Sequence, residues 1–195
     1  MNITIGQKIQ LIPANKFETD KSKKFVVGEY EVKKIGTFNN DLADLGILFL
    51  NDDQIITILT VDGETQCLFL RKYEDFVPVT RQQAVDADML WLFQEPDNES
   101  WTADELKFTD NVFDDVAQVC YDKELDMEAT YTEEPVRKGL TNMYASFNQY
   151  SLHDESLARN YLVLLELGIN DNKANGMLFF YQGFSINEDN FKILD

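Results

Sequence analysis

The chain has 195 residues, enough for one large domain or two small ones, and a hydrophobic content of 44% that can fill a sizeable core. It contains no run of 18 apolar residues, which excludes a membrane-spanning helix. Its net charge of −18 repels phosphates, so we expect neither nucleic acid nor an anionic membrane surface as a direct partner.

The first forty residues predict two β-rich segments. Residues 3–11 alternate well enough for a strand that ends at Pro13. Residues 25–38 form a second segment, in which Gly28 or Gly36 would mark a bulge. The N-terminus lacks the basic and apolar regions of a secretory signal peptide, so we expect a cytoplasmic protein.

Residues 53–73 carry the strongest local signal, a β-hairpin. Two β-rich runs flank Asp62-Gly63, and Asp-Gly is typical of a two-residue type I′ turn. This turn places Val61 opposite Glu64 and gives the strand pair two apolar faces. A strand pair that is apolar on both faces is usually buried on both, so we place the hairpin in the middle of a sheet that continues from a short strand at 46–50.

The middle of the chain is strongly acidic and is predicted to be mixed in structure. Residues 82–136 hold two Lys against sixteen Asp or Glu. We expect a strand at 89–94 and one helical turn at 102–105. The best helical pattern lies at 111–121, where apolar residues fall on one face and Asp114 and Asp115 lie in the first turn. Residues 122–135 look irregular, with an edge strand near 128–131.

The last third is predicted to be β again. Residues 141–150 alternate, with Met143, Ala145 and Phe147 on one side. The apolar runs 161–167 and 177–186 are joined by turn-forming residues and predict a second long hairpin.

These elements together predict a β-dominated α+β fold with few helices. Its N-terminal part, residues 1–80, is an antiparallel meander of five or six strands, closed or nearly closed into a barrel. Its C-terminal part, residues 81–195, is an acidic lobe rich in hairpins. The two parts are either separate domains or one continuous domain.

The sequence identifies no catalytic, cofactor-binding or metal-binding residue. The single histidine, His153, precedes Asp154 and Glu155, but a lone histidine in a polar turn is most often a turn residue. Asp86 and Asp88 could share one face of a strand and hold a hard cation, without forming a calcium-loop motif. The two cysteines, Cys67 and Cys120, are expected to be reduced core residues.

Several short motifs resemble those of the YjfK-like family of bacterial proteins of unknown function. They are Met143-Tyr144, residues 159–164, residues 181–183 and the basic-aromatic element Arg71-Lys72-Tyr73. The resemblance implies a cytosolic bacterial protein, often encoded near envelope-stress genes of the phage-shock-protein type. It implies no activity and no catalytic residues.

The acidic stretch at residues 82–136 indicates what kind of partner the protein binds. We expect a non-catalytic accessory factor that binds another protein, a basic one, through this surface. Two alternatives stay open: an inhibitor or immunity protein that mimics DNA, and an enzyme built on carboxylates or a metal. The interpretation that needs no partner is an acidic surface that only keeps the protein soluble. The candidate partner surface consists of Asp86, Asp88, Asp97, Glu99, Asp104, Glu105, Asp114 and Asp115.

Overall fold

The computed structural model describes residues 3–12, 28–39, 41, 43–72, 79–80, 105–109, 118–136, 143–152, 160–169, 172–187 and 190–194. Every regular element in these ranges is a β-strand, which confirms a β-dominated fold. The described residues contain no helix, so they do not support the helical part of the predicted α+β class.

The strands before residue 80 are β1 (Lys8–Leu11), β2 (Glu29–Glu31), β3 (Lys34–Asn39), β4 (Asp44–Phe49), β5 (Gln54–Val61), β6 (Glu64–Lys72) and β7 (Val79–Thr80). Those after it are β8 (Glu105–Thr109), β9 (Gln118–Glu134), β10 (Met143–Leu152), β11 (Asn160–Ile169), β12 (Asn172–Ile186) and β13 (Phe191–Leu194).

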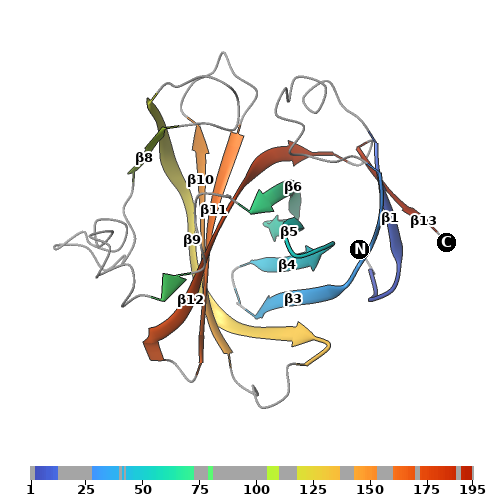
Figure 1. The fold of residues 1–195 in the computed structure, drawn as a ribbon, viewed down its shortest axis with the longest axis horizontal. Coiled ribbons are helices and arrows are strands. Elements are labelled where there is room, and N and C mark those ends of the chain that lie inside the picture. The colour runs from blue at the N-terminus through green and yellow to red at the C-terminus, as the bar shows by residue number, and fades with distance from the viewer. Residues whose placement is uncertain are drawn as a thin grey trace.

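Eight of these strands close into an antiparallel barrel (Figure 1). Strands β3 to β6 form one meander and β9 to β12 form another. The two meanders join at two seams, where β3 pairs with β9 and β6 pairs with β12. Figure 1 shows β3–β6 running across β9–β12, with the long β12 curving from one set of strands to the other.

An antiparallel meander is present in the N-terminal part, but it has four strands, β3–β6, and it does not close by itself. We expected five or six strands before residue 80 to curl nearly shut. Only β3–β6 enter the barrel, and their outer edges are completed by strands that follow residue 117. Pairing of β3 with β9 and of β6 with β12 removes both free edges of the meander. The N–H and C=O groups that an open sheet would leave unpaired at its edges are thereby hydrogen-bonded.

The β5–β6 hairpin has the predicted turn and register. Asp62 and Gly63 have φ angles of 52° and 83°, as a type I′ turn requires. Val61 lies opposite Glu64, and Ile56 lies opposite Phe69. Both predicted apolar faces are largely buried, because one lines the barrel interior and the other lies beneath a second sheet.

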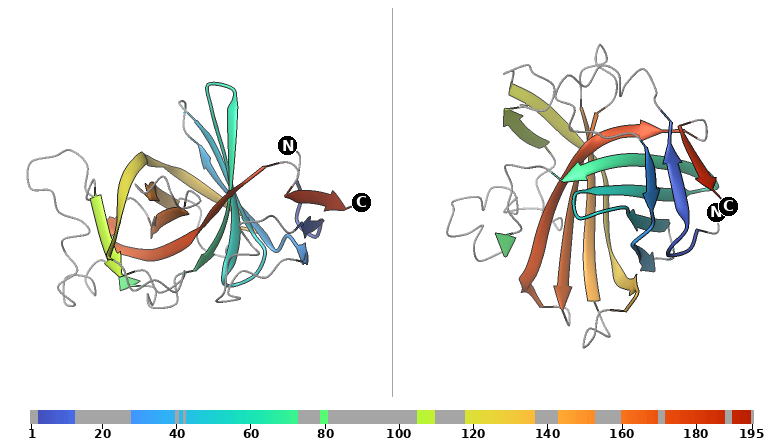
Figure 2. Two further views of the ribbon diagram at one scale, coloured as in Figure 1. Left: turned by 90° about the horizontal axis from the view of Figure 1, so that it is seen from above. Right: turned by 45° about the vertical axis from the view of Figure 1, so that its right-hand side comes forward.

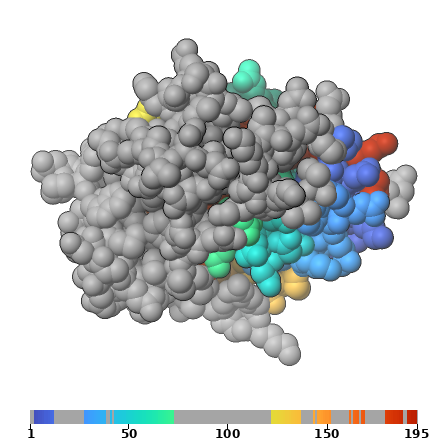
Figure 3. Space-filling model, turned by 45° about the horizontal axis from the view of Figure 1, so that its top comes forward, coloured from blue at the N-terminus to red at the C-terminus, as the bar shows by residue number. Residues whose placement is uncertain are grey.

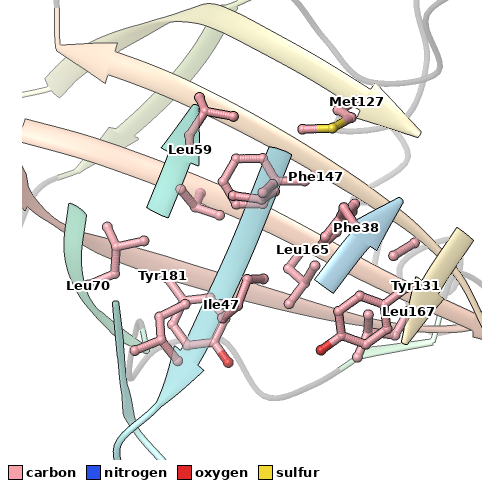
Figure 4. Packing of buried hydrophobic residues seen from close by; sticks show 14 of the residues in the cluster. Phe38, Ile47, Leu59, Leu70, Met127, Tyr131, Phe147, Leu165, Leu167 and Tyr181 are labelled. Atoms are coloured by element: carbon pink, nitrogen blue, oxygen red, sulfur yellow. The ribbon is translucent and has the colours of Figure 1, made fainter. Parts of the chain in front are cut away.

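The barrel interior is a solid apolar core (Figure 4). Inward-facing side chains from all eight barrel strands meet there, and Phe38 makes edge contacts with the rings of Tyr131 and Phe147 at centroid distances of 5.2 and 5.9 Å. The buried interior residues include Phe38, Ile47, Leu59, Leu70, Met127, Tyr131, Phe147, Leu165, Leu167 and Tyr181. Because side chains fill the middle of the barrel, chemistry is left to its ends.

A three-stranded sheet, β13-β1-β2, covers part of the outside of the barrel (Figure 2, right). The predicted segment 25–38 supplies strands to both sheets, since β2 belongs to this small sheet and β3 to the barrel. Ile56 and Phe69 point away from the interior and yet are fully buried. Figure 3 shows the small sheet and strands β3–β6 as one continuous part of the surface.

The predicted helix at 111–121 is wrong where the structure describes it. Gln118–Tyr121 begin β9, a 17-residue strand that pairs with β8, β10 and β3. Residues 111–117 lie outside the described residues, as do the predicted strand at 89–94 and most of the turn at 102–105. Glu105 itself lies in a strand, β8.

The prediction of an irregular segment at 122–135 is also wrong, because residues 122–134 belong to strand β9. Alternating polar residues made this segment look like a loop with an edge strand. In the barrel, the same alternation places one side of β9 in the core and the other in solvent, and partners on both sides fix the strand. Tertiary pairing thus overrides the local pattern.

The C-terminal strands carry the expected alternation. Met143, Ala145 and Phe147 of β10 face the core and are buried. The apolar runs 161–167 and 177–186 lie in β11 and β12, which pair antiparallel with Leu164 opposite Phe180.

Each seam of the barrel has a glycine on its inner face. Gly36 of β3 lies beneath the ring of Tyr131, where a Cβ atom would overlap that ring. Gly183 of β12 lies against β6, where a Cβ atom would overlap the carbonyl oxygen of Phe69. Glycine in a strand interior commonly marks such close approaches and bends.

We predict that Gly183→Ala destabilises the protein by about 1–3 kcal/mol or more, because backbone atoms cannot move aside as a flexible side chain would. Gly46→Ala is the matched control, since no atom lies within 4 Å of its added Cβ. It should leave stability unchanged or raise it by up to about 1 kcal/mol. Urea unfolding measures both, and equal midpoints for the two variants would contradict the close packing at the seam.

Candidate functional site

The predicted partner surface falls almost entirely outside the described residues. Glu105 is the first residue of β8, and its side chain is not described. The other seven positions lie outside the described ranges: Asp86, Asp88, Asp97, Glu99, Asp104, Asp114 and Asp115. The described part of the acidic stretch is therefore the backbone of β8, together with β9 and the two residues after it.

Strand β9 divides its acidic residues between two environments. Glu128 and Glu134 point outward and are exposed, whereas Glu133 points into the barrel and is 4% exposed. Adjacent carboxylates in a strand point to opposite faces, as expected for Glu133 and Glu134. The outer face of β9 thus presents acidic groups, with Asp126 in an ion pair with Lys123 at 3.4 Å.

A β-bulge near the start of β9 brings the exposed Glu124 within reach of an inward-facing side chain of β10. Gln149 of β10 lies opposite Leu125, but the next residue, Tyr150, lies opposite Lys123. Glu124 is therefore the extra residue of the bulge. Bulges re-aim side chains, and here Glu124 reaches the side chain of Gln149.

Glu124 belongs to a polar network at this end of the barrel. The Nε2 of Gln149 donates to the Oε1 of Gln66 at 2.8 Å and to the Oε2 of Glu124 at 3.3 Å. The Nε2 of Gln66 donates to the hydroxyl of Tyr161 at 3.2 Å. Four different strands supply these side chains, so the closed barrel itself assembles the network.

One hydrogen-bond acceptor of the network, the Oε1 of Gln149, has no donor in the described part of the chain. Gln149 is only 3% exposed, and its Oε1 has no hydrogen-bond partner among the described residues. The amide orientation is set by two acceptors around Nε2, so exchanging the two amide atoms would lose both bonds. A buried acceptor without a donor costs about 1–3 kcal/mol, which a suitable donor would recover.

A pocket of about 470 Å³ opens at the same end, beside the β5–β6 hairpin. Figure 2 (left) shows this hairpin projecting past the neighbouring strands. The pocket is lined by Leu59, Val61, Asp62, Glu64, Thr65 and Gln66. We call this pocket and the adjoining network of Gln66, Glu124, Gln149 and Tyr161 the mouth of the barrel.

The opposite end of the barrel holds an internal ion pair. The Nζ of Lys34 lies 3.0 Å from the Oε1 of Glu133, whose side chain is 1% exposed. The same oxygen accepts a hydrogen bond from the hydroxyl of Tyr131 at 3.1 Å. The Lys34 ammonium also lies 3.8 Å from the ring centroid of Phe49, a favourable cation–π distance. These contacts pair the Oε1 of Glu133 with a cation and a hydroxyl group.

Tyr181 lies near this ion pair. Burial raises the pKa of its hydroxyl well above the ordinary value of 10, and the negative charges of Asp53 and Glu133 raise it further. Tyr181 therefore stays neutral at physiological pH and is no candidate for an activated nucleophile or base.

The described residues contain no group of three His, Cys, Asp or Glu side chains that could hold a metal ion. Cys67 is a buried cysteine outside any disulfide, as expected for a reduced core residue, while the side chain of Cys120 is not described. His153, like the Asp86 and Asp88 pair, lies outside the described residues.

The mouth residues were not found from the sequence. A signal existed, because Gln66 and Gln149 each occupy the polar end of an otherwise apolar alternating face. That pattern marks where an inward face reaches a barrel end. The pattern cannot show that Gln66 and Gln149 meet, because these two residues are 83 positions apart in the sequence.

The chain matches no protein-family model, and the searches of curated proteins and of solved structures found no match to it. Within the described ranges, no helix of the length and apolarity needed to cross a membrane is present.

We predict that Lys34→Met costs on the order of 2–3 kcal/mol of unfolding free energy, because Glu133 loses its cation while buried. The added change Glu133→Leu should restore much of this loss, since an apolar pair of similar size needs no compensation. The control is Lys33→Met, which removes a pair of the same 3.0 Å length whose side chains are 59% and 47% exposed.

The control should cost less than about 1 kcal/mol. Chemical unfolding of the three variants makes the comparison. Equal losses in Lys34→Met and Lys33→Met would show that the internal pair is solvated and has no special role.

Proposed function

We propose that the protein is a non-catalytic binding protein that holds a basic partner protein against an acidic surface. The observation that carries the proposal is the exposed acidic side of β9, which belongs to the most acidic stretch of the chain. Within the described residues, Glu128 and Glu134 stand outward on a strand whose other side is anchored in the core.

The barrel makes this surface rigid. β9 pairs with β10 at Glu128 and with β3 at Glu134, so the backbone that carries these outward side chains is held in the sheet. A fixed array of like charges attracts a basic partner over a Debye length of about 8–10 Å and raises its rate of association. Because the backbone of β9 is already ordered, binding needs little further backbone ordering.

DNA mimicry is the second candidate. Outward residues on a strand repeat at about 7 Å, which is close to the spacing of phosphates along one DNA strand. Asp126 and Glu128 satisfy this spacing, but Thr130 and Thr132 interrupt the row before Glu134. Because the described row is broken, we favour the basic protein over a protein that normally binds DNA.

The resemblance to the YjfK-like family adds a context to the proposal, a basic component of an envelope-stress assembly. An enzyme that works through carboxylates or a metal is the third candidate, and no observation on the described residues favours it.

The test is affinity capture from a lysate of the source cells at low salt and at about 0.5 M salt, where screening is steep. We expect a basic protein to bind at low salt and to be lost at high salt. Glu128→Gln/Glu134→Gln should weaken its capture several-fold at low salt. The matched control is Glu29→Gln/Glu31→Gln, which removes two exposed charges from β2 on the small sheet.

Capture that is equal at both salts, or equal in both double variants, would contradict the proposal. Capture of a nucleic-acid-binding protein that free DNA competes away would favour the DNA mimic.

A further inference from the structure

We propose that the mouth of the barrel binds an aliphatic cation, namely an ammonium or guanidinium group on an alkyl stem. This inference deepens the proposed function and rests on it, because a basic side chain of the partner carries this chemistry. The ligand would lie in the pocket beside the β5–β6 hairpin and direct its charged head toward the network of Gln66, Glu124 and Gln149.

The charge of the mouth selects a cation. Asp62 and Glu64 line the pocket, and Glu124 extends the acidic character into the network. Among the described lining residues there is no Lys or Arg to neutralise them. Carboxylate and amide oxygens accept hydrogen bonds from ammonium and guanidinium groups, and such charge-assisted bonds are stronger than neutral ones.

The unsatisfied acceptor points to a donor-bearing ligand independently of the charge. The Oε1 of Gln149 is buried and has no partner among the described residues, whereas the Nε2 of the same amide is fully used. The missing group is therefore a hydrogen-bond donor. Gln66 connects this amide directly to the pocket, because it both lines the pocket and accepts the bond from Gln149.

The apolar part of the pocket suits an alkyl stem. Leu59 lies at the inner wall and is 8% exposed, while Val61 is 37% exposed at the rim. Lysine and arginine side chains lay their methylene groups along such surfaces while their charged heads reach polar groups. A pocket with an apolar wall and an acidic, acceptor-rich end therefore fits a basic side chain better than a metal ion or a simple inorganic cation.

The position of Asp62 is fixed by the fold. Its φ angle of 52° belongs to the type I′ turn, which the neighbouring strands hold in register. Asn also tolerates this backbone conformation, so Asp62→Asn removes the charge without disturbing the turn. The site can therefore be tested without unfolding the hairpin.

The experiment is a titration followed by amide chemical shifts in NMR. The probe is N-acetyl-arginine amide, and agmatine serves as a free amine with the same guanidinium head. N-acetyl-citrulline amide is the matched control, because it has nearly the same shape but no charge. We expect both guanidinium probes to shift the resonances of residues 59–66 and the side-chain amides of Gln66 and Gln149, and citrulline to do so at least tenfold more weakly.

Two charge variants localise the effect. Asp62→Asn/Glu124→Gln should weaken the binding of the arginine probe at least tenfold, whereas Glu29→Gln/Glu31→Gln on β2 should leave it unchanged. Equal binding of citrulline, equal weakening by both double variants, or shifts spread evenly over the acidic surface would overturn the proposal.

The outcomes also separate this inference from the proposed function and identify the source of the cation. If the captured partner is released by the arginine probe, its own side chain occupies the mouth. If the probe binds but releases no partner, the mouth serves a free amine. If a basic partner is captured but the probe does not bind, the inference fails while the proposed function stands.

Discussion

The closure of the barrel along two seams is the constraint on which the remaining structure depends. The β3–β9 and β6–β12 pairings join segments that are far apart in sequence. Glycine allows the close approach at each seam, because Tyr131 packs over Gly36 and the β6 backbone lies against Gly183. Without these pairings, each meander would expose two sheet edges and the apolar face that now lines the interior.

Closure also explains why the polar groups collect at the two ends. Most inward positions in the middle of the barrel strands are apolar and fill the interior, with Thr57 as a buried polar exception. The polar side chains that bond to one another across strands lie toward the strand ends, and the closed sheet brings them together there. One end pairs its charges internally, since Lys34 contacts Glu133 and Tyr131 donates to the same carboxylate oxygen. The mouth has a pocket next to the buried amide of Gln149, whose Oε1 has no hydrogen-bond partner among the residues that the structure describes, and a pocket with such polar groups suits a ligand.

Sequence reasoning succeeded where the structure is determined locally. The Asp62-Gly63 turn, its register and the two faces of the β5–β6 hairpin follow from backbone sterics and the two-residue period of a strand. Sequence reasoning failed where pairing between strands far apart in the sequence determines the structure. Residues 118–121 fit a helical pattern but pair as a strand with β8 and β10. The mouth likewise depends on contacts, such as Gln66 to Gln149, that no local pattern reveals.

The most direct test of this account is to detect both seams in solution by NMR. Nuclear Overhauser contacts should connect the backbones of Thr37 and Thr132 across one seam and of Phe69 and Phe184 across the other. The amides of β3 and β6 that bond across the seams should exchange with solvent as slowly as those of β5, an interior strand of its meander. Contacts within each meander but none across the seams, with fast exchange along β3 and β6, would show two separate sheets and contradict a closed barrel.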